Sequence, residues 1–243
     1  MVASVQLNIG GEIIFTMSIV IASSRPQHKK FIDEIGQRTG ESVTYIDDKA
    51  RVNFESLVSI NPKFVFFPHW SYIIPASVFE NFRCVIFHMT DLPFGRGGSP
   101  LQNLIARGIY ETQISAIQCV ETLDGGDIYM KRPLSLYGSA EEIFLRAAEI
   151  IKEMMIEIIR AEPKPYPQSG DPVIFKRRTP KDGNIESLDS LERVFDYIRM
   201  LDAEGYPPAF LETRHFRLEF GRASRRANEI LADVKIKMRA DNE

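Results

Sequence analysis

Short apolar runs alternate with segments of helical periodicity over the first two thirds of this chain. Each run ends at turn residues, and the run Phe64–Phe67 is apolar at every position, as expected for a strand covered on both faces. The alternation predicts an α/β fold whose core is a doubly wound, mostly parallel sheet. The predicted strands are Ser18–Ala22, Val43–Ile46, Phe64–Phe67, Val85–His88, Ile114–Val120 and Ile128–Arg132.

The helices between these strands follow from the spacing of apolar residues and from capping signals. In the longest, Ser139 precedes the helix and Glu142 follows three residues later, which is the pattern of a capping box. The predicted helices are Gln27–Arg38, Phe54–Ile60, Pro75–Glu80, Leu101–Arg107 and Ala140–Ala161.

The composition changes after the longest helix, which divides the chain. Residues 17–161 form the expected main domain, and residues 162–172 a proline-rich, semi-extended connector. Residues 173–243 form a small α+β extension, with a strand at Val173–Lys176, a helix at Leu188–Leu201 and strands near Arg214–Phe220. Residues 1–16 are either an additional hairpin or an over-extended start, and the sequence does not separate these two interpretations.

Composition and charge exclude several classes of protein. The apolar fraction of 44% and the net charge of −3 are ordinary for a soluble domain, and a chain without a global basic field is not expected to have nucleic acid as its main partner. Cys84 and Cys119 lie in apolar runs, which favours buried free thiols in a reducing compartment. No apolar stretch reaches the ~20 residues of a membrane helix, and no secretory signal is recognisable, so we expect a cytoplasmic protein without a membrane partner.

Two proton-active side chains follow strand-like runs next to glycines. His88 ends one run and Asp124 follows another, beside Gly125 and Gly126. Ligands of doubly wound sheets bind beyond the carboxyl ends of the strands, so His88, Asp124 and Trp70 can converge there. A histidine and a carboxylate placed in this way suit acid–base chemistry. The four histidines are scattered and no zinc-like spacing occurs, so no metal is predicted.

The segment from His88 to Asp127 resembles the core of the folate-dependent formyltransferases. That family has Asn-x-His-x-Ser-Leu-Leu-Pro before a glycine-containing loop, and later Leu-Asp-x-Gly-Asp. The matching residues here are His88, Thr90, Leu92, Pro93, Arg96, Gly97, Pro100, Gln102, Leu123, Asp124, Gly126 and Asp127. The likeness extends to 71–75, 178–185, 198–199 and 206–210, and so covers roughly residues 18 to 212.

The resemblance implies an enzyme that transfers a formyl group from N10-formyltetrahydrofolate to an amine. His88 and Asp124 take the place of the family's catalytic pair. The residues implied to bind the folate are Trp70, Tyr72, Thr90, Pro93, Arg96, Gly97, Gly98 and Asp127.

One position departs from the family pattern in a way that bears on catalysis. Ile86 stands where the family has its catalytic asparagine, and an isoleucine side chain donates no hydrogen bond. Loss of one oxyanion donor typically costs ~10²–10³ in rate. His69 and Ser71 are the candidate replacements, and Asp91 adds a charge where the family usually has leucine.

The short extension directs the choice of acceptor. A C-terminal part of this size resembles that of nucleotide-amino-sugar N-formyltransferases, so such a sugar is the expected small-molecule substrate, and a homodimer is consistent with that group. Two alternatives remain open: a methionyl-tRNA formyltransferase-like enzyme, and a catalytically impaired homologue that binds folate or a nucleotide sugar.

Overall fold

The computed structural model describes residues 5–7, 13–15 and 18–239. Its helices are α1 (Ile32–Thr39), α2 (Phe54–Ile60), α3 (Ala76–Phe79), α4 (Pro100–Ile105), α5 (Ala140–Ala161) and α6 (Leu191–Arg199), with 3-10 turns η1 (Pro26–Phe31), η2 (Lys49–Arg51) and η3 (Pro180–Gly183). Its strands are β1 (Val5–Leu7), β2 (Ile13–Phe15), β3 (Ser18–Ser23), β4 (Ser42–Ile46), β5 (Pro62–His69), β6 (Cys84–His88), β7 (Phe94–Gly97), β8 (Glu111–Gln118), β9 (Ile128–Ser135), β10 (Val173–Phe175), β11 (Ala209–Glu212), β12 (Phe216–Arg225) and β13 (Ile230–Met238).

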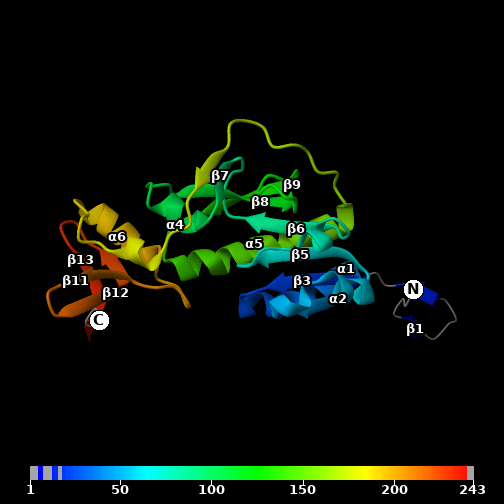
Figure 1. The fold of residues 1–243 in the computed structure, drawn as a ribbon, viewed down its shortest axis with the longest axis horizontal. Helices are drawn as coiled ribbons and strands as arrows, with labels where there is room; N and C mark the ends of the chain where they lie inside the picture. The colour runs from blue at the N-terminus through cyan, green and yellow to red at the C-terminus, as the bar shows by residue number, and fades with distance from the viewer. Residues whose placement is uncertain (1–4, 8–12, 16–17, 240–243) are drawn as a thin grey trace.

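A six-stranded sheet in the order β4-β3-β5-β6-β8-β9 forms the centre of the molecule (Figure 1). The strands β4, β3, β5 and β6 are parallel, which confirms the predicted mostly parallel α/β sheet. β8 runs antiparallel to β6, and β9 antiparallel to β8. The short link from β8 to β9 explains part of this difference, because parallel neighbours need a crossover of a dozen or more residues.

Side chains that alternate along each strand divide the core into two layers. Ile19, Ile21 and Phe66 point to the face covered by α1, α4 and α5. Val20 and Phe67 point to the opposite face, which is covered by α2 and α3. Because both faces are covered, these strands can be apolar throughout, as the sequence indicated.

Helix α5 begins and ends at the residues that its pattern predicted. The Ser139 hydroxyl accepts a hydrogen bond from the backbone N–H of Glu142 at 3.3 Å, and the Ser139 backbone N–H donates to the Glu142 carboxylate at 2.7 Å. Figure 1 shows α5 running along the sheet toward the C-terminal part of the molecule. The helix thereby joins the two parts.

Strand β7 belongs to the loop after His88 and was not predicted. It pairs in parallel with β10, so the strand that opens the expected C-terminal extension lies against the main domain. The connector 162–172 spans the distance between the end of α5 and β10 (Figure 1), and Tyr166 bridges to Ile128 on the way. The start of the extension is therefore fastened to the loop that follows His88.

The rest of the extension is a three-stranded antiparallel sheet, β11-β12-β13, with α6 packed on β12. β11 and β13 were not predicted, although Ala232, Val234 and Ile236 alternate with the polar residues Asp233, Lys235 and Lys237. At the other end of the chain, β1 and β2 pair as an antiparallel hairpin, and the remainder of 1–16 lies outside the described residues.

Two features are absent from the described residues, a membrane-spanning helix and a metal-binding cluster. No helix there is long and apolar enough to span a membrane. Likewise, no cluster of His, Cys, Asp and Glu within 5–7, 13–15 and 18–239 could hold a metal ion.

Candidate active site

His88 and Asp124 lie together beyond the carboxyl end of β6. The Nδ1 atom of His88 is 3.6 Å from the Asp124 carboxylate, and both side chains are buried. The Nε2 atom of His88 donates to the carbonyl oxygen of Gly95 at 2.8 Å. Since a carbonyl only accepts, this contact places a proton on Nε2. In the neutral ring, Nδ1 is then the nitrogen without a proton.

Asp124 is held at both its carboxylate and its backbone carbonyl. Its second carboxylate oxygen accepts a hydrogen bond from the backbone N–H of Gly97 at 2.9 Å. Its carbonyl oxygen accepts from the Gln168 amide at 2.8 Å, and the same amide nitrogen donates to the carbonyl of Gly126 at 2.8 Å. Asp124 has a positive φ of 51°, a conformation that asparagine and aspartate tolerate better than most residues.

Two glycines allow this close packing. A Cβ on Gly97, whose φ is 104°, would lie 2.5 Å from the carbonyl oxygen of Phe175 in β10. A Cβ on Gly126 would lie 1.9 Å from the carbonyl oxygen of Gln118. The glycines of the motif therefore let backbone meet backbone around the pair, which is a structural role that could not be assigned from the sequence.

Arg96 and Thr90 support the same loop. The Arg96 guanidinium donates twice to the Gln168 side-chain oxygen, at 3.1 and 2.7 Å. Thr90 is fully buried, and its carbonyl accepts from the Ser115 hydroxyl at 2.8 Å. Gln168 thus joins the loop after β6 to the loop after β8.

Ile86 lies two residues before His88, on the same side of β6. It packs against the apolar residues Leu92, Ile117 and Ile128 and offers no donor there. The structure therefore leaves the family's asparagine without a side-chain equivalent at this position.

His69 and Ser71 lie at the carboxyl end of the neighbouring strand. Both line a cavity of about 390 Å³, which also includes Arg25, Glu141 and Tyr206. The His69 ring contacts Phe144 edge-on, and neither His69 nor Ser71 makes a hydrogen bond to His88 among the described residues. Burial, followed by the charge of Arg25, lowers the pKa of His69 to about 4. His69 is therefore neutral at pH 7 and keeps one N–H to donate.

The remaining residues of the implied folate site lie in two places. Trp70 and Tyr72 contact each other edge-on at 5.3 Å in the loop after β5, and the indole nitrogen of Trp70 is buried without a hydrogen-bond partner. Pro93 and Gly98 lie next to β10: the Pro93 carbonyl accepts from Val173, and Gly98 packs on Arg177. Asp127 is half-buried, and its carbonyl accepts from Gln118.

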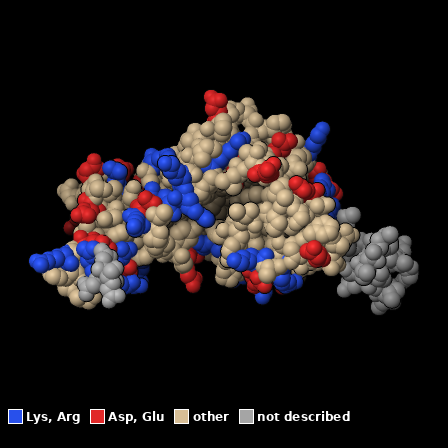
Figure 2. Space-filling model, viewed as in Figure 1, with Lys and Arg blue, Asp and Glu red and all other residues tan. Residues whose placement is uncertain are grey.

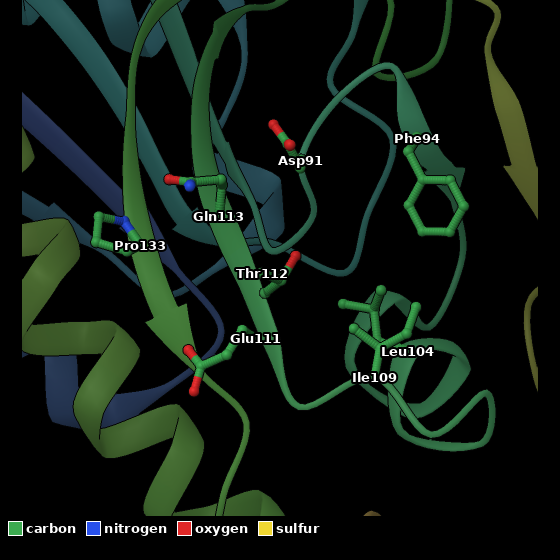
Figure 3. A pocket seen from close by; sticks show the side chains of 8 residues that line it. All are labelled: Asp91, Phe94, Leu104, Ile109, Glu111, Thr112, Gln113 and Pro133. Atoms are coloured by element: carbon green, nitrogen blue, oxygen red, sulfur yellow. The ribbon is translucent and has the colours of Figure 1, made fainter.

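A second cavity, of about 280 Å³, lies beside the loop after β6 (Figure 3). Residues of β8 and β9 line one side, and Phe94, Leu104 and Ile109 line the other. Asp91 reaches its rim and pairs with Lys131 at 2.5 Å. The unexpected charge at Asp91 is therefore neutralised locally, and neither His88 nor Asp124 lines this cavity.

Sequence reasoning missed three residues of this region: Gln168, Arg25 and Glu141. Arg25 follows directly after β3 and its final serines, so the strand-end rule applied to His88 would have pointed to it. Gln168 carries no such signal, because its contacts depend on how the connector crosses the molecule.

The geometry places His88 and Asp124 together at the carboxyl edge of a doubly wound sheet, and comparisons with known proteins identify the family. The family model described as the C-terminal domain of methionyl-tRNA formyltransferase matches residues 180–237. The structure of a methionyl-tRNA formyltransferase from Clostridium thermocellum is 49% identical, covers 91% of this chain and 99% of its own, and superposes with a TM-score of 0.88. The chain belongs to the formyltransferase family, and the resemblance of the His88–Asp127 segment is confirmed.

More distant relatives extend the comparison. The methionyl-tRNA formyltransferase of Gluconobacter oxydans is 28% identical over 175 residues, which are 70% of this chain and 57% of that protein. The chain thus spans less than two thirds of the length of the curated relatives it matches. HypX from Aquifex aeolicus in complex with tetrahydrofolic acid shares the fold, with 18% identity, a TM-score of 0.71, and coverage of 85% of this chain and 38% of that one.

Proposed function

We propose that this chain transfers a formyl group from N10-formyltetrahydrofolate to the primary amine of methionyl-tRNA. The observation that carries the proposal is the buried His88–Asp124 pair, held by Gly95, Gly97 and Gln168 at the carboxyl edge of the sheet. This acceptor replaces the amino sugar expected from the length of the extension, because the methionyl-tRNA formyltransferases described above share 49% and 28% identity with this chain.

His88 acts as the proton carrier in this proposal. When the amine nitrogen bonds to the formyl carbon, it must lose a proton, and the unprotonated Nδ1 of His88 is the acceptor that the hydrogen-bond pattern leaves. Asp124 stabilises the resulting imidazolium and fixes the orientation of the ring. The proton then passes to the nitrogen that leaves the formyl carbon.

His69 is the proposed donor to the oxyanion in place of the missing asparagine. It lies two residues beyond Phe67, which pairs with Ile86, so its strand end is next to that of His88. A neutral imidazole donates a hydrogen bond without first giving up a charge, which suits a negative charge that develops only in the transition state.

The loops after β5 and β8 fit the folate. The orphaned, buried indole nitrogen of Trp70 is a donor without an acceptor, and the pteridine ring system offers acceptors. Ile73 and Leu123 are 95% and 70% exposed, which leaves apolar surface for the flat ring. When bound, the folate supplies the formyl group, and the residues around it bind and orient it.

Surface charge supports a nucleic acid as acceptor. Figure 2 shows Lys and Arg gathered where Figure 1 places α4 and β7, between the main domain and the C-terminal part. A local cluster of cations attracts phosphates even though the net charge of the whole chain is −3. The family-model match to a tRNA-enzyme domain at residues 180–237 adjoins the same region.

The test is single-turnover release of tetrahydrofolate with methionyl-tRNA or with amino-sugar nucleotides as acceptor. We expect turnover with methionyl-tRNA, and a loss of about 10²–10⁴-fold in His88→Ala and Asp124→Asn, as for removal of a general acid–base. His215→Ala is the matched control, because that histidine is exposed on the C-terminal part. Turnover that survives His88→Ala would overturn the mechanism. Turnover with an amino-sugar nucleotide but not with methionyl-tRNA would show that the acceptor is the sugar expected from the sequence.

A further inference from the structure

Arg25 is a buried cation whose hydrogen bonds are not used. Its exposed fraction is only 9%, and its guanidinium lies 3.9 Å from the ring centre of Phe144 and 5.5 Å from that of Tyr206. Its one ion pair within the described residues is with Glu141, at a long 3.8 Å. No hydrogen bond is donated by this guanidinium to any group in the described part of the chain.

A guanidinium in this state is suited to an external acceptor. It presents five N–H donors in a planar fork that matches the oxygens of a phosphate or carboxylate. The nitrogens of Arg25 are not among the fully buried polar atoms without a partner, so they remain accessible to a ligand oxygen, with which they would form a charge-assisted hydrogen bond. The aromatic rings of Phe144 and Tyr206 hold the plane of the fork in place, so little ordering remains to be done on binding.

The cavity beside Arg25 supplies further unpaired polar groups. The amide nitrogen of Gln27 is buried without a partner, and Ser24 and Ser71 contribute to the same wall. Two carboxylates, Glu141 and Glu204, also line the cavity, and they suit the amino group of a ligand. The cavity therefore offers one cation and two anions, a set complementary to an amine that also carries a negative group.

Its position links the cavity to the reaction. His69, which lines it, is at the end of β5, and the β5–β6 pairing places that end beside His88. Neighbouring strands are ~4.8 Å apart, so an amine in the cavity can approach the His88 edge. The cavity also includes Tyr206 from the C-terminal part, so it lies between the two parts of the molecule, where ligand sites are frequent.

We infer that this cavity is the acceptor half of the active site, and that Arg25 binds a phosphate group carried by the acceptor while Glu141 faces its amine. The inference rests on the proposed function for its place in the reaction. The phosphate could belong to the terminal nucleotide of a tRNA or to a nucleotide-linked sugar, because the chemistry that Arg25 recognises is the same.

Binding measurements test this without any formyl transfer. Calorimetric titration with 5′-AMP against adenosine, and with UDP against uridine, measures what the phosphate adds in each case. A charge-assisted hydrogen bond gives about 10- to 100-fold in affinity, so we expect the phosphorylated probe to bind at least about tenfold tighter than its nucleoside. The pair with the larger ratio identifies the source of the phosphate.

Three variants make the test specific. Arg25→Met should reduce the phosphate ratio to about one, whereas Lys29→Gln, which removes an exposed cation of the same turn, should leave it unchanged. Glu141→Gln removes the ion-pair partner of Arg25 and should tighten binding of 5′-AMP severalfold, an increase that misfolding cannot produce.

The outcomes separate the two claims. A phosphate ratio that persists in Arg25→Met, or no binding of either phosphorylated probe, would overturn the acceptor-site inference. Phosphate-dependent binding without tetrahydrofolate release from any acceptor would instead contradict the proposed function and leave the phosphate site standing.

Discussion

Two buried arginines, one in each part of the molecule, differ in what surrounds them. Arg199, at the end of α6, donates to the Asp196 carboxylate at 2.7 Å and to the carbonyl oxygens of Leu136 and Gly138 at 2.5 and 3.0 Å. Arg25, at the end of β3, donates to none of the described residues and faces a cavity. Both are more than nine-tenths buried.

The difference separates a structural charge from one that awaits a ligand. Arg199 joins α6 to the turn before α5 and so fixes the C-terminal part on the main domain. Burial raises the pKa of Asp196, which shows that the carboxylate lies in a poorly hydrated place. The guanidinium of Arg25 stacks on aromatic rings but has few hydrogen-bond acceptors near it. Its N–H donors are therefore available to a ligand.

The largest expected effect is on stability, when Arg199 is removed. Arg199→Met leaves the buried Asp196 carboxylate without a partner, and breaking a buried pair in this way costs about 3–5 kcal/mol. Arg25→Met should cost much less, because it gives up no hydrogen bond within the described chain. Urea unfolding of both variants measures the two losses side by side.

The double variant Asp196→Leu/Arg199→Met is the control. Replacing both partners by apolar residues removes the uncompensated charge and should recover much of the loss. If Arg25→Met proved as destabilising as Arg199→Met, the two arginines would not differ in role, and Arg25 would be a structural residue.

The sequence predicted what depends on local pattern. α2 and α5 begin and end as expected, since their caps, Asn53 and the Ser139–Glu142 box, lie within a few residues of the helices they start. β7 escaped prediction because it contains glycines and its partner β10 is distant in sequence. β13 had the alternation of a strand and could have been found.

The candidate site likewise has features that the sequence could predict and features that it could not. The nearness of His88 and Asp124 follows from strand-end positions and from the family resemblance. The use of Arg96 to hold Gln168 could not be foreseen, because a charge in a glycine loop looks free to meet a ligand. Nor could the sequence place His69 in a cavity with Arg25, since that depends on the register of β3 against β5.

The next largest effect is the pH dependence of stability caused by His28, a neighbour of Arg25. Its ring accepts or donates at 2.7 Å to the Ser23 hydroxyl, and burial, followed by the charges of His69 and Arg25, lowers its pKa to about 3. Below pH 6.5 the unfolded chain takes up a proton that the folded chain refuses, so stability falls as the pH falls. The expected loss between pH 7 and pH 5 is about 2 kcal/mol.

Thermal or urea unfolding at both pH values measures the total loss, and His28→Gln should remove the share that His28 contributes. His69 contributes in the same direction, since its pKa is also lowered. His215→Ala, at an exposed position, should keep the full dependence. Equal stability at pH 7 and pH 5 would mean that the region around Arg25 admits a further positive charge, contrary to the lowered pKa of His28.

Gln168→Ala is expected to have the smallest effect on stability. It should nevertheless have a clear effect on formyl transfer. Gln168 uses both ends of its amide to join the loop after β6 to the loop after β8, much as Arg199 joins the C-terminal part to the main domain. Losing these bonds should cost about 1–2 kcal/mol of stability. Because Asp124 would then be held by Gly97 alone, kcat for formyl transfer should fall about tenfold or more while the KM for the acceptor changes little.

Gln118→Ala, an exposed glutamine of β8, is the matched control for this loss. A rise in KM at constant kcat would place Gln168 in substrate binding rather than in positioning Asp124. If both kinetic constants stayed at their original values, the Gly97 N–H would suffice to hold the carboxylate. Gln168 would then have a purely structural role, as Arg199 does.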